Sequence, residues 1–91
     1  MELTLQEFAN DRYNLLKLLY DNQIKVKDDF YIPLSQQEIA DIAHYSKIKT
    51  NRILNELINM DCLITYQSKR GKYAITDMGH KILILIQKVI I

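Results

Sequence analysis

Residues 35 to 64 carry the pattern that most restricts the fold of this chain, SQQEIADIAHYSKIKTNRILNELINMDCLI. Ser35 and Glu38 have the spacing of a capping box, in which two side chains satisfy free backbone N–H groups at the start of a helix. Ser46 can cap a second, longer helix that runs to about Met60 and is followed by a strand. The sequence therefore predicts two helices joined by a tight turn, with a strand after the second helix.

Apolar residues recur at helical spacing on one side of each of these helices. The residues expected in the core are Ile39, Ala40, Ile42 and Ala43 from the first helix, and Leu54, Leu57 and Ile58 from the second, with Ile53 at the margin. The other side of the second helix is polar and basic. Such a surface suits the groove of a duplex, because cations neutralise phosphates and amides or guanidinium groups contact base edges.

The segments before residue 35 predict one more helix and a loop. A helix is expected from near Thr4 to about Asn22, followed by a polar, charged loop at residues 23–30. Pro33 excludes the interior of a helix and disfavours the helical conformation for the residue before it. Residues 31–34 are therefore expected to be a short extended segment.

A hairpin and a final helix are predicted after residue 61. Residues 62–67 and 72–76 are rich in β-branched and aromatic side chains, with a turn-like segment between them. The last helix, at about 77–91, is apolar on more than one face through Ile82, Leu83, Leu85, Ile86, Val89, Ile90 and Ile91. An apolar helix surface must be covered. The first helix could cover part of it and a second copy the rest, as a two-fold dimer. Complete burial within one chain, or a natural C-terminus that lies further on, are the alternatives.

Composition indicates one folded domain, at residues 1–91, with a small core. The chain has 91 residues, of which 48% are apolar and 25% charged. Cys62 is the only cysteine, which excludes an intrachain disulfide, and no secretory segment stands at the start, so we expect a cytoplasmic protein. The longest apolar run, residues 82–86, is too short to span a bilayer, and no membrane partner is expected.

Charge is unevenly distributed, although the net charge is only +1. Residues 1–43 contain four basic and eight acidic side chains, whereas residues 44–73 contain six basic and two acidic side chains. Half of the twelve cations thus fall in one third of the chain. This distribution predicts a surface with one positive side, as a polyanionic partner requires.

Three motifs in this order resemble winged helix-turn-helix DNA-binding domains. Ser35-x-x-Glu38-Ile39-Ala40 is similar to the opening of the family's second helix. Ser46 with Arg52, Leu54 and Leu57 is similar to its recognition helix, and the segment 73–79, YAITDMG, to the strand-to-helix junction after the wing. The resemblance covers residues 31–85. It implies a mainly α fold with a small β-hairpin: a three-helix core, a β wing and a C-terminal helix.

The chain departs from the family at two turns. His44 stands in the tight turn where a glycine is usual, and Asp61-Cys62 replaces a glycine before the first wing strand. The geometry of these two turns is therefore open. Many relatives are dimers joined by terminal helices, and some carry a ligand domain, for which no residues remain among these 91.

The expected DNA interface has a helix, a wing and peripheral contacts. The helix-turn-helix is expected at about residues 35–60. In its second helix, the recognition helix, the predicted DNA-binding residues are Ser46, Lys47, Ile48, Lys49, Thr50, Asn51, Arg52 and Asn55. In the wing, at about 62–76, they are Ser68, Lys69, Arg70 and Lys72. Further phosphate contacts are predicted at Ser35, Gln36, His44 and Tyr45. Asn51 suits adenine, Arg52 suits guanine or phosphate, and Ile48 suits a thymine methyl group.

Simpler explanations stay open for these features. The basic helix could be an ordinary amphipathic helix and the wing a solubilising turn. Tyr66 and Tyr73 are expected to pack across the hairpin strands.

Cys62 fits a buried thiol better than a redox sensor, because no cation or helix start is placed to lower its pKa. With His44 and His80 it lacks metal-ligand spacing. No nucleophile with a base, and no phosphate-binding glycine loop, is evident, so neither an enzyme nor a cofactor is expected.

The sequence thus predicts sequence-specific binding of double-stranded DNA by a small transcriptional regulator. A first alternative is an accessory protein at a plasmid replication or conjugative transfer origin. A second, of another class, is a winged helix that binds another protein.

Overall fold

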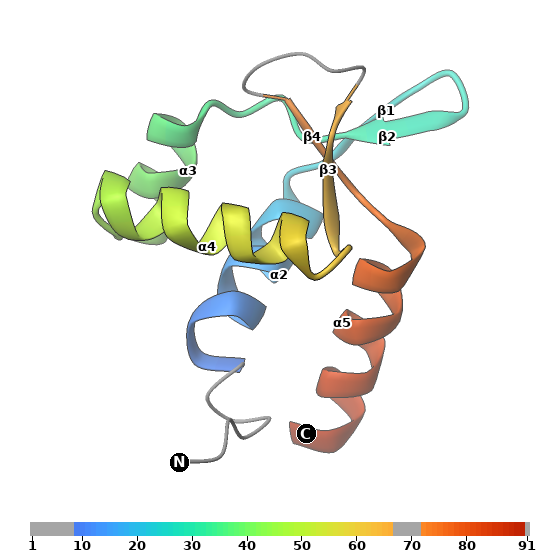
Figure 1. Ribbon diagram of the computed structural model, residues 1–91. Coiled ribbons are helices and arrows are strands. Elements are labelled where there is room, and N and C mark those ends of the chain that lie inside the picture. The colour runs from blue at the N-terminus through green and yellow to red at the C-terminus, as the bar shows by residue number, and fades with distance from the viewer. Residues whose placement is uncertain (1–8, 67–71, 91) are drawn as a thin grey trace.

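The computed structural model describes residues 9–66 and 72–90, and within these residues the chain is mainly helical with two small antiparallel hairpins (Figure 1). In chain order the elements are the π-helical segment η1 (Ala9–Tyr13), α2 (Asn14–Asp21), β1 (Ile24–Val26), β2 (Asp29–Tyr31), α3 (Gln36–Ala43), α4 (Lys47–Asn59), β3 (Leu63–Thr65), β4 (Tyr73–Ile75) and α5 (Asp77–Ile90). This confirms the predicted fold class. The helix start expected near Thr4 lies outside the described residues, whereas the end near Asn22 is confirmed, because α2 ends at Asp21.

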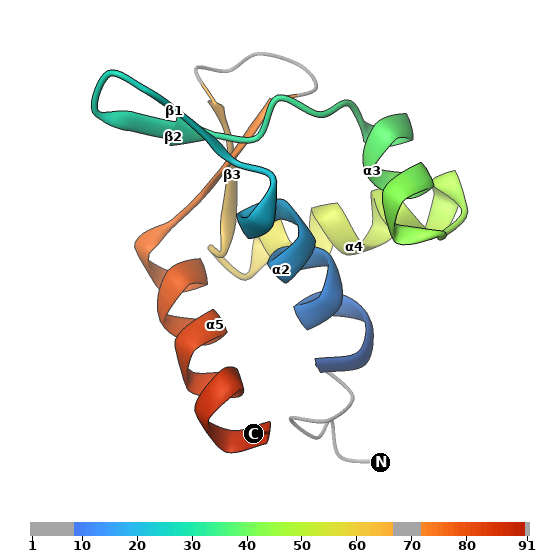
Figure 2. The ribbon, with the colours of Figure 1, turned by 180° about the vertical axis from the view of Figure 1, so that it is seen from behind.

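One apolar core lies between the helices and the hairpin β3–β4. The rod formed by η1 and α2 contacts α3, α4 and α5 (Figures 1 and 2). The fully or almost fully buried apolar side chains are Leu15, Leu16 and Leu19 of α2, Ile39 and Ala40 of α3, Ile53, Leu54 and Leu57 of α4, and Ile32, Cys62 and Leu63 near the strands. Burying one large apolar side chain contributes about 1.5–3 kcal/mol. These residues come from three helices and from the segments beside the strands, so the core determines how α3 and α4 are set against the hairpin.

Two core predictions on α3 and α4 are wrong. Ile42 is 46% exposed, because the buried arc of α3 is formed by Ile39 and Ala40, and residue 42 lies on its outer flank. Ile53, expected at the margin, is completely buried, because it shares the inner arc of α4 with Leu54.

Side-chain caps determine where α3 and α4 begin. The Ser35 hydroxyl accepts the Glu38 backbone N–H at 3.1 Å, and the Glu38 carboxylate accepts the Ser35 N–H at 3.0 Å. The Ser46 hydroxyl accepts the Lys49 N–H at 3.0 Å. Each cap stabilises a helix by about 1 kcal/mol. Both predicted caps are confirmed, and the second one places Lys47 and Ile48 in the first turn of α4.

The two turns that lack the family's glycine keep a left-handed backbone. His44 has a φ of 60° and Asp61 a φ of 59°. After α3, the His44 N–H donates to the Asp41 carbonyl and the next N–H to the Ala40 carbonyl. After α4, the Asp61 N–H donates to the Ile58 carbonyl and the next N–H to the Leu57 carbonyl. These are Schellman ends, whose left-handed residue is usually glycine but can be a polar residue. The departures change the residue and leave the turn geometry intact.

The segment 23–30, predicted to be a loop, is mostly part of the hairpin β1–β2, which runs from Ile24 to Tyr31, so that prediction is wrong. Ile24 pairs with Tyr31, and the two residues Lys27 and Asp28 make the turn, with a φ of 57° at Lys27. Two-residue hairpin turns need positive φ angles, for which lysine carries no sequence signal. The hairpin projects beyond the helices in both views (Figures 1 and 2).

The second hairpin, β3–β4, is joined to the chain before α3. Leu63 pairs with Ile75 inside the hairpin. On the other edge of β4, the Ile32 N–H donates to the Tyr73 carbonyl at 2.7 Å in an isolated bridge. The predicted extended segment at 31–34 is therefore confirmed at its first two residues, and it fixes β4 beside the start of α3.

Thr76 joins the start of α5 to the end of α4. Its hydroxyl donates to the Asp61 carbonyl and accepts the Gly79 N–H at 3.0 Å, while its N–H donates to the Cys62 carbonyl at 3.1 Å. The helix start predicted after Thr76 is confirmed, since α5 begins at the next residue. Of the described helices, none has the length and apolar character needed to cross a lipid bilayer.

Candidate nucleic-acid interface

The outer face of α4 carries five of the eight predicted residues of the recognition helix. Lys47, Ile48, Asn51, Arg52 and Asn55 are all exposed, at positions that successive 100° rotations place on one side of the helix. Ile48 is 84% exposed, the largest value among the described apolar residues with exposed side chains. Lys47, Ile48 and Asn51 line a shallow hollow of about 300 Å³. We call these five residues the α4 face.

Thr50 does not belong to the α4 face, and the prediction that it contacts DNA is wrong. Its side chain is completely buried. The reason is position, because residue 50 lies one turn before Ile53 and Leu54 on the core side of α4. Its hydroxyl has no hydrogen-bond partner among the described residues. Thr50 is therefore a packing residue with an unpaired polar atom.

Replacing Thr50 by valine should raise the free energy of unfolding by about 1–2 kcal/mol, because valine keeps the shape and removes an unpaired buried hydroxyl, which costs roughly 1–3 kcal/mol. Urea denaturation measures the change. Thr50→Ser keeps the hydroxyl and removes the methyl group, so this control should be less stable than the natural chain. Equal or lower stability of the valine variant would contradict the prediction.

Lys49 is turned towards the N-terminal rod. Its ammonium lies 3.3 Å from the Asp11 carboxylate and 4.2 Å from the centre of the Tyr45 ring. This cation–π contact and ion pair hold the side chain at the edge of the α4 face. A carboxylate thus lies beside one of the predicted DNA-binding cations, which the sequence did not indicate because Asp11 is 38 positions away in the chain.

Arg52 and Lys47 differ in their carboxylate neighbours. The Arg52 guanidinium lies 3.8 Å from Glu56, which also accepts a hydrogen bond of 2.9 Å from Arg12. Lys47 has no ion-pair partner in the part of the chain that the structure describes. Because exposed ion pairs are worth only about 0–1 kcal/mol, a phosphate could replace the carboxylate beside Arg52.

A chain of side-chain hydrogen bonds connects α4 to α3 and β4. The Asn55 amide donates to the Asn51 oxygen at 2.9 Å, the Asn51 amide donates to the Gln36 oxygen at 3.1 Å, and the Gln36 amide donates to the Tyr73 hydroxyl at 3.2 Å. Tyr73 is 5% exposed. The sequence predicted Asn51 and Gln36 as separate contacts, and it carried no signal that Tyr73 would join them, because the three elements are distant in the chain.

The predicted peripheral contacts have different structural roles. Ser35 is exposed but already caps α3. Gln36 is part of the hydrogen-bonded chain. Tyr45 packs against the core. His44 is exposed, and its left-handed backbone ends α3. The structure therefore brings Gln36 next to Asn51, uses Ser35 to begin α3, and places His44 and Tyr45 in the turn between α3 and α4.

The wing residues predicted to contact DNA are described only in part. Ser68, Lys69 and Arg70 lie outside the described residues. The Lys72 ammonium lies 5.4 Å from the centre of the Tyr31 ring. Tyr66, expected to pack across its own hairpin, stacks on Tyr31 with ring centroids 4.7 Å apart and an angle of 13°. The first hairpin thus contacts the second just beyond the end of β3, through an aromatic stack.

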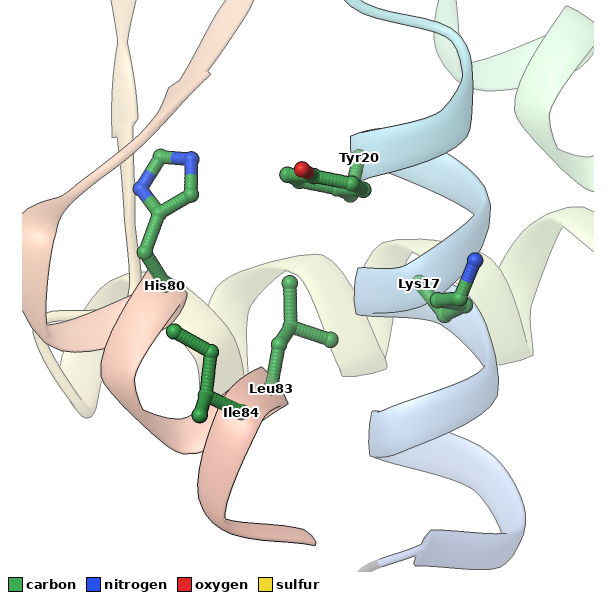
Figure 3. A pocket seen from close by; sticks show the side chains of 5 residues that line it. All are labelled: Lys17, Tyr20, His80, Leu83 and Ile84. Carbon is green, nitrogen blue, oxygen red and sulfur yellow. The ribbon is translucent and has the colours of Figure 1, made fainter. Parts of the chain in front are cut away.

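A separate pocket of about 310 Å³ lies between α2 and α5. Figure 3 shows its lining residues, Lys17, Tyr20, His80, Leu83 and Ile84. The Tyr20 and His80 rings meet edge to face with centroids 5.7 Å apart. A hydrogen bond to Asp21 raises the pKa of Lys17, whose ammonium is already paired there. Tyr20 and Ile84 are 44% and 53% exposed, so the pocket opens onto an apolar surface.

Cys62 is a buried free thiol, as predicted. Burial, with a smaller contribution from Asp61, raises the pKa of the thiol, so little of the reactive thiolate is present at neutral pH. In the described parts of the chain, no three His, Cys, Asp or Glu side chains are grouped so that they could hold a metal ion.

Comparison with known proteins gives structural likeness alone. No protein-family model and no curated protein matches the sequence. The reduced CO-sensing protein of R. rubrum aligns with a TM-score of 0.68 and 18% identity, over 91% of this chain and 38% of that one. S. aureus MepR in a DNA complex aligns with a TM-score of 0.68 and 23% identity, over 94% and 68%. CprK with o-chlorophenolacetic acid aligns with a TM-score of 0.59 and 24% identity, over 89% and 35%.

The chain therefore spans well under half of the CO-sensing protein and of CprK, and about two thirds of MepR. At these identities the likeness concerns the backbone. It agrees with the order of elements described above, in which two capped helices joined by a tight turn are followed by a hairpin and a further helix. The chain has the winged helix-turn-helix fold that its three motifs resemble.

Proposed function

We propose that this chain binds double-stranded DNA sequence-specifically and acts as a small transcriptional regulator. The α4 face carries the proposal, since it presents two amides, a guanidinium, an ammonium and an exposed apolar side chain on one side of a helix. These are the groups that contact base edges and phosphates in a major groove. That MepR, which shares the fold, was solved bound to DNA supports the proposal.

In this proposal α4 lies in the major groove and the β3–β4 hairpin follows the adjacent backbone or minor groove. Asn51 contacts a base, Arg52 contacts a guanine or a phosphate, and Ile48 contacts a thymine methyl group. Lys47, near the N-terminus of α4, binds a phosphate, where the helix dipole also favours an anion. Lys49 and Arg52 exchange carboxylate neighbours for phosphates. This exchange is feasible because both ion pairs are partly exposed and so contribute little to stability.

Selection of bound duplexes from a random pool tests the proposal. A common sequence in the selected pool is expected, and the affinity for it should fall with salt at a slope of roughly 0.9 per phosphate contacted. The selected sequence would also show whether the site has one half or two. Enrichment of no sequence, together with affinity that salt does not change, would reject DNA binding.

A protein-binding winged helix is the second candidate, and two observations favour it. Ile48 is 84% exposed beside the hollow on α4, as expected for an anchor residue at a protein interface. Lys49 and Arg52 each have a carboxylate neighbour, which reduces the positive potential of the face. The salt titration separates the two candidates, since binding to a protein through an apolar anchor depends weakly on salt.

The DNA-binding proposal includes two biological roles. The chain could repress a gene by occupying an operator, or it could mark a plasmid replication or conjugative transfer origin for other proteins. Both roles use the same α4 face. The genomic position of the selected sequence, beside a promoter or within an origin, separates them.

We also propose that two copies associate through α5. Met78, Ile84 and Leu85 are 49%, 53% and 60% exposed, so the alternative of complete burial within one chain does not hold for these residues. Ile84 adjoins the open pocket between α2 and α5. A two-fold arrangement lets the same apolar edge of each copy cover the pocket of the other, and it would match a site with two halves.

Replacing Leu85 by glutamate should convert this dimer into a monomer, because each copy would then place a carboxylate in an interface that otherwise buries apolar side chains. Sedimentation velocity over a range of protein concentrations measures the change. Ile48→Glu places the same charge at an exposed apolar residue of α4, away from α5, and it should leave the dimer intact. A natural chain that stays monomeric at every concentration would contradict the proposed association.

A further inference from the structure

The hydrogen-bonded chain from α4 to β4 has one direction. At each of its three links an amide NH2 is the donor and an oxygen is the acceptor. Each carboxamide has two N–H donors and an oxygen with two acceptor positions. Asn51 uses one N–H towards Gln36 and one oxygen lone pair towards Asn55. It therefore keeps one N–H and one lone pair for an outside partner, and its side chain is exposed.

We propose that Gln36 and Tyr73 are positioning residues that fix the orientation of the Asn51 amide and thereby determine the base that it contacts. This inference rests on the proposed DNA binding. Adenine presents an N7 acceptor beside an N6 donor in the major groove. With its nitrogen towards α3 and its oxygen towards Asn55, the Asn51 amide matches adenine in one register. An amide turned over would exchange donor and acceptor, and the match in that register would be lost.

The two supporting residues are held by rigid parts of the fold. Tyr73 is 5% exposed, and its backbone bonds to Ile32. Gln36 is the first residue of α3, directly after the Ser35 cap. A side chain is well positioned when the residues that hold it cannot easily move. A side chain that is free to adopt other rotamers makes its contact for only part of the time. The wing strand and the start of α3 thus both act on the orientation of a base-contacting group on α4.

Substitutions at Gln36 separate positioning from contact with phosphate. Gln36→Leu removes both hydrogen bonds, and Tyr73→Phe removes only the hydroxyl that holds the Gln36 amide in place. In Gln36→Glu the carboxylate accepts from both Asn51 and Tyr73, so the orientation of Asn51 is kept although a negative charge is added. Gln37 is the matched control, because this neighbouring glutamine is exposed and its side chain, within the described residues, bonds only to Asp41 of its own helix.

The experiment is duplex selection and affinity measurement with the full chain and these variants. Asn51→Ala first identifies the base pair that Asn51 reads, where a bidentate amide contributes a preference of roughly fivefold to a hundredfold. Gln36→Leu and Tyr73→Phe should lower the preference at that base pair towards the Asn51→Ala value, while Gln37→Leu leaves it unchanged. Gln36→Glu should keep the preference and lose the same overall affinity as Gln37→Glu. Thermal unfolding verifies that each variant is folded.

Two results would overturn the inference and leave DNA binding in place. One is an unchanged base preference in both Gln36→Leu and Tyr73→Phe. The other is an equal loss on all duplexes in Gln36→Leu, which would make Gln36 a phosphate contact. A natural chain that selects no sequence would instead reject the proposed function, and the positioning role with it.

Discussion

Replacing Gly79 by alanine should lower the free energy of unfolding by about 2 kcal/mol, since overpacking a tight contact typically costs 1–3 kcal/mol. A Cβ at residue 79 would overlap the Cys62 carbonyl oxygen and lie 2.7 Å from Cγ2 of Ile75. The oxygen belongs to the backbone and also accepts the Thr76 N–H, so it cannot move aside without breaking that bond. A loss of this size lowers the melting temperature of a domain this small by about 8–16 °C.

The sign of this effect is informative, because alanine favours a helix over glycine by about 1 kcal/mol. Lys81→Ala, at an exposed position of the same helix, controls for the general effect of an added alanine and should change the melting temperature little. If Gly79→Ala is instead as stable as the natural chain, α5 can move away from the end of α4, and the junction is looser than the structure indicates.

Gly79 also illustrates what the sequence could predict. The motif from Tyr73 to Gly79 predicted a strand followed by a helix, because such junctions depend on neighbours in the chain. The caps at Ser35 and Ser46 were predictable for the same reason, since each involves residues three apart. The fold class followed from these local signals and their order.

The predictions that failed depend on features that no local residue preference signals. Charges in residues 23–30 indicated a solvated loop, and the hairpin there depends on a lysine at positive φ, which no residue preference announces. The boundary of the α4 face was imprecise because Thr50 is as polar as its exposed neighbours, and only packing against the core distinguishes it. The Asp11–Lys49 pair and the link from Gln36 to Tyr73 join segments far apart in the chain.

Replacing Asn51 by alanine should weaken binding to the preferred duplex by about 1–3 kcal/mol, the value of one good bidentate base contact. The reason is that Asn51 is exposed at the centre of the α4 face, with one donor and one acceptor position left after its bonds to Gln36 and Asn55. Titration of labelled duplexes at fixed salt measures the affinity. Binding to random DNA should fall much less, and the salt slope should not change, because a neutral amide releases no counterion.

Asn59→Ala is the control for this prediction, because Asn59 is also an exposed asparagine of α4 but is its last residue, about two turns beyond Asn51. It should bind the preferred duplex like the natural chain. An equal loss for Asn51→Ala on preferred and random duplexes would mean that residue 51 contacts the backbone. Arg52 carries a charge, so Arg52→Ala should flatten the salt slope. Asn51 is neutral, so Asn51→Ala should leave the slope unchanged even if residue 51 contacts the backbone. The two neighbouring residues therefore separate the contribution of charge from that of base recognition on the same turn of α4.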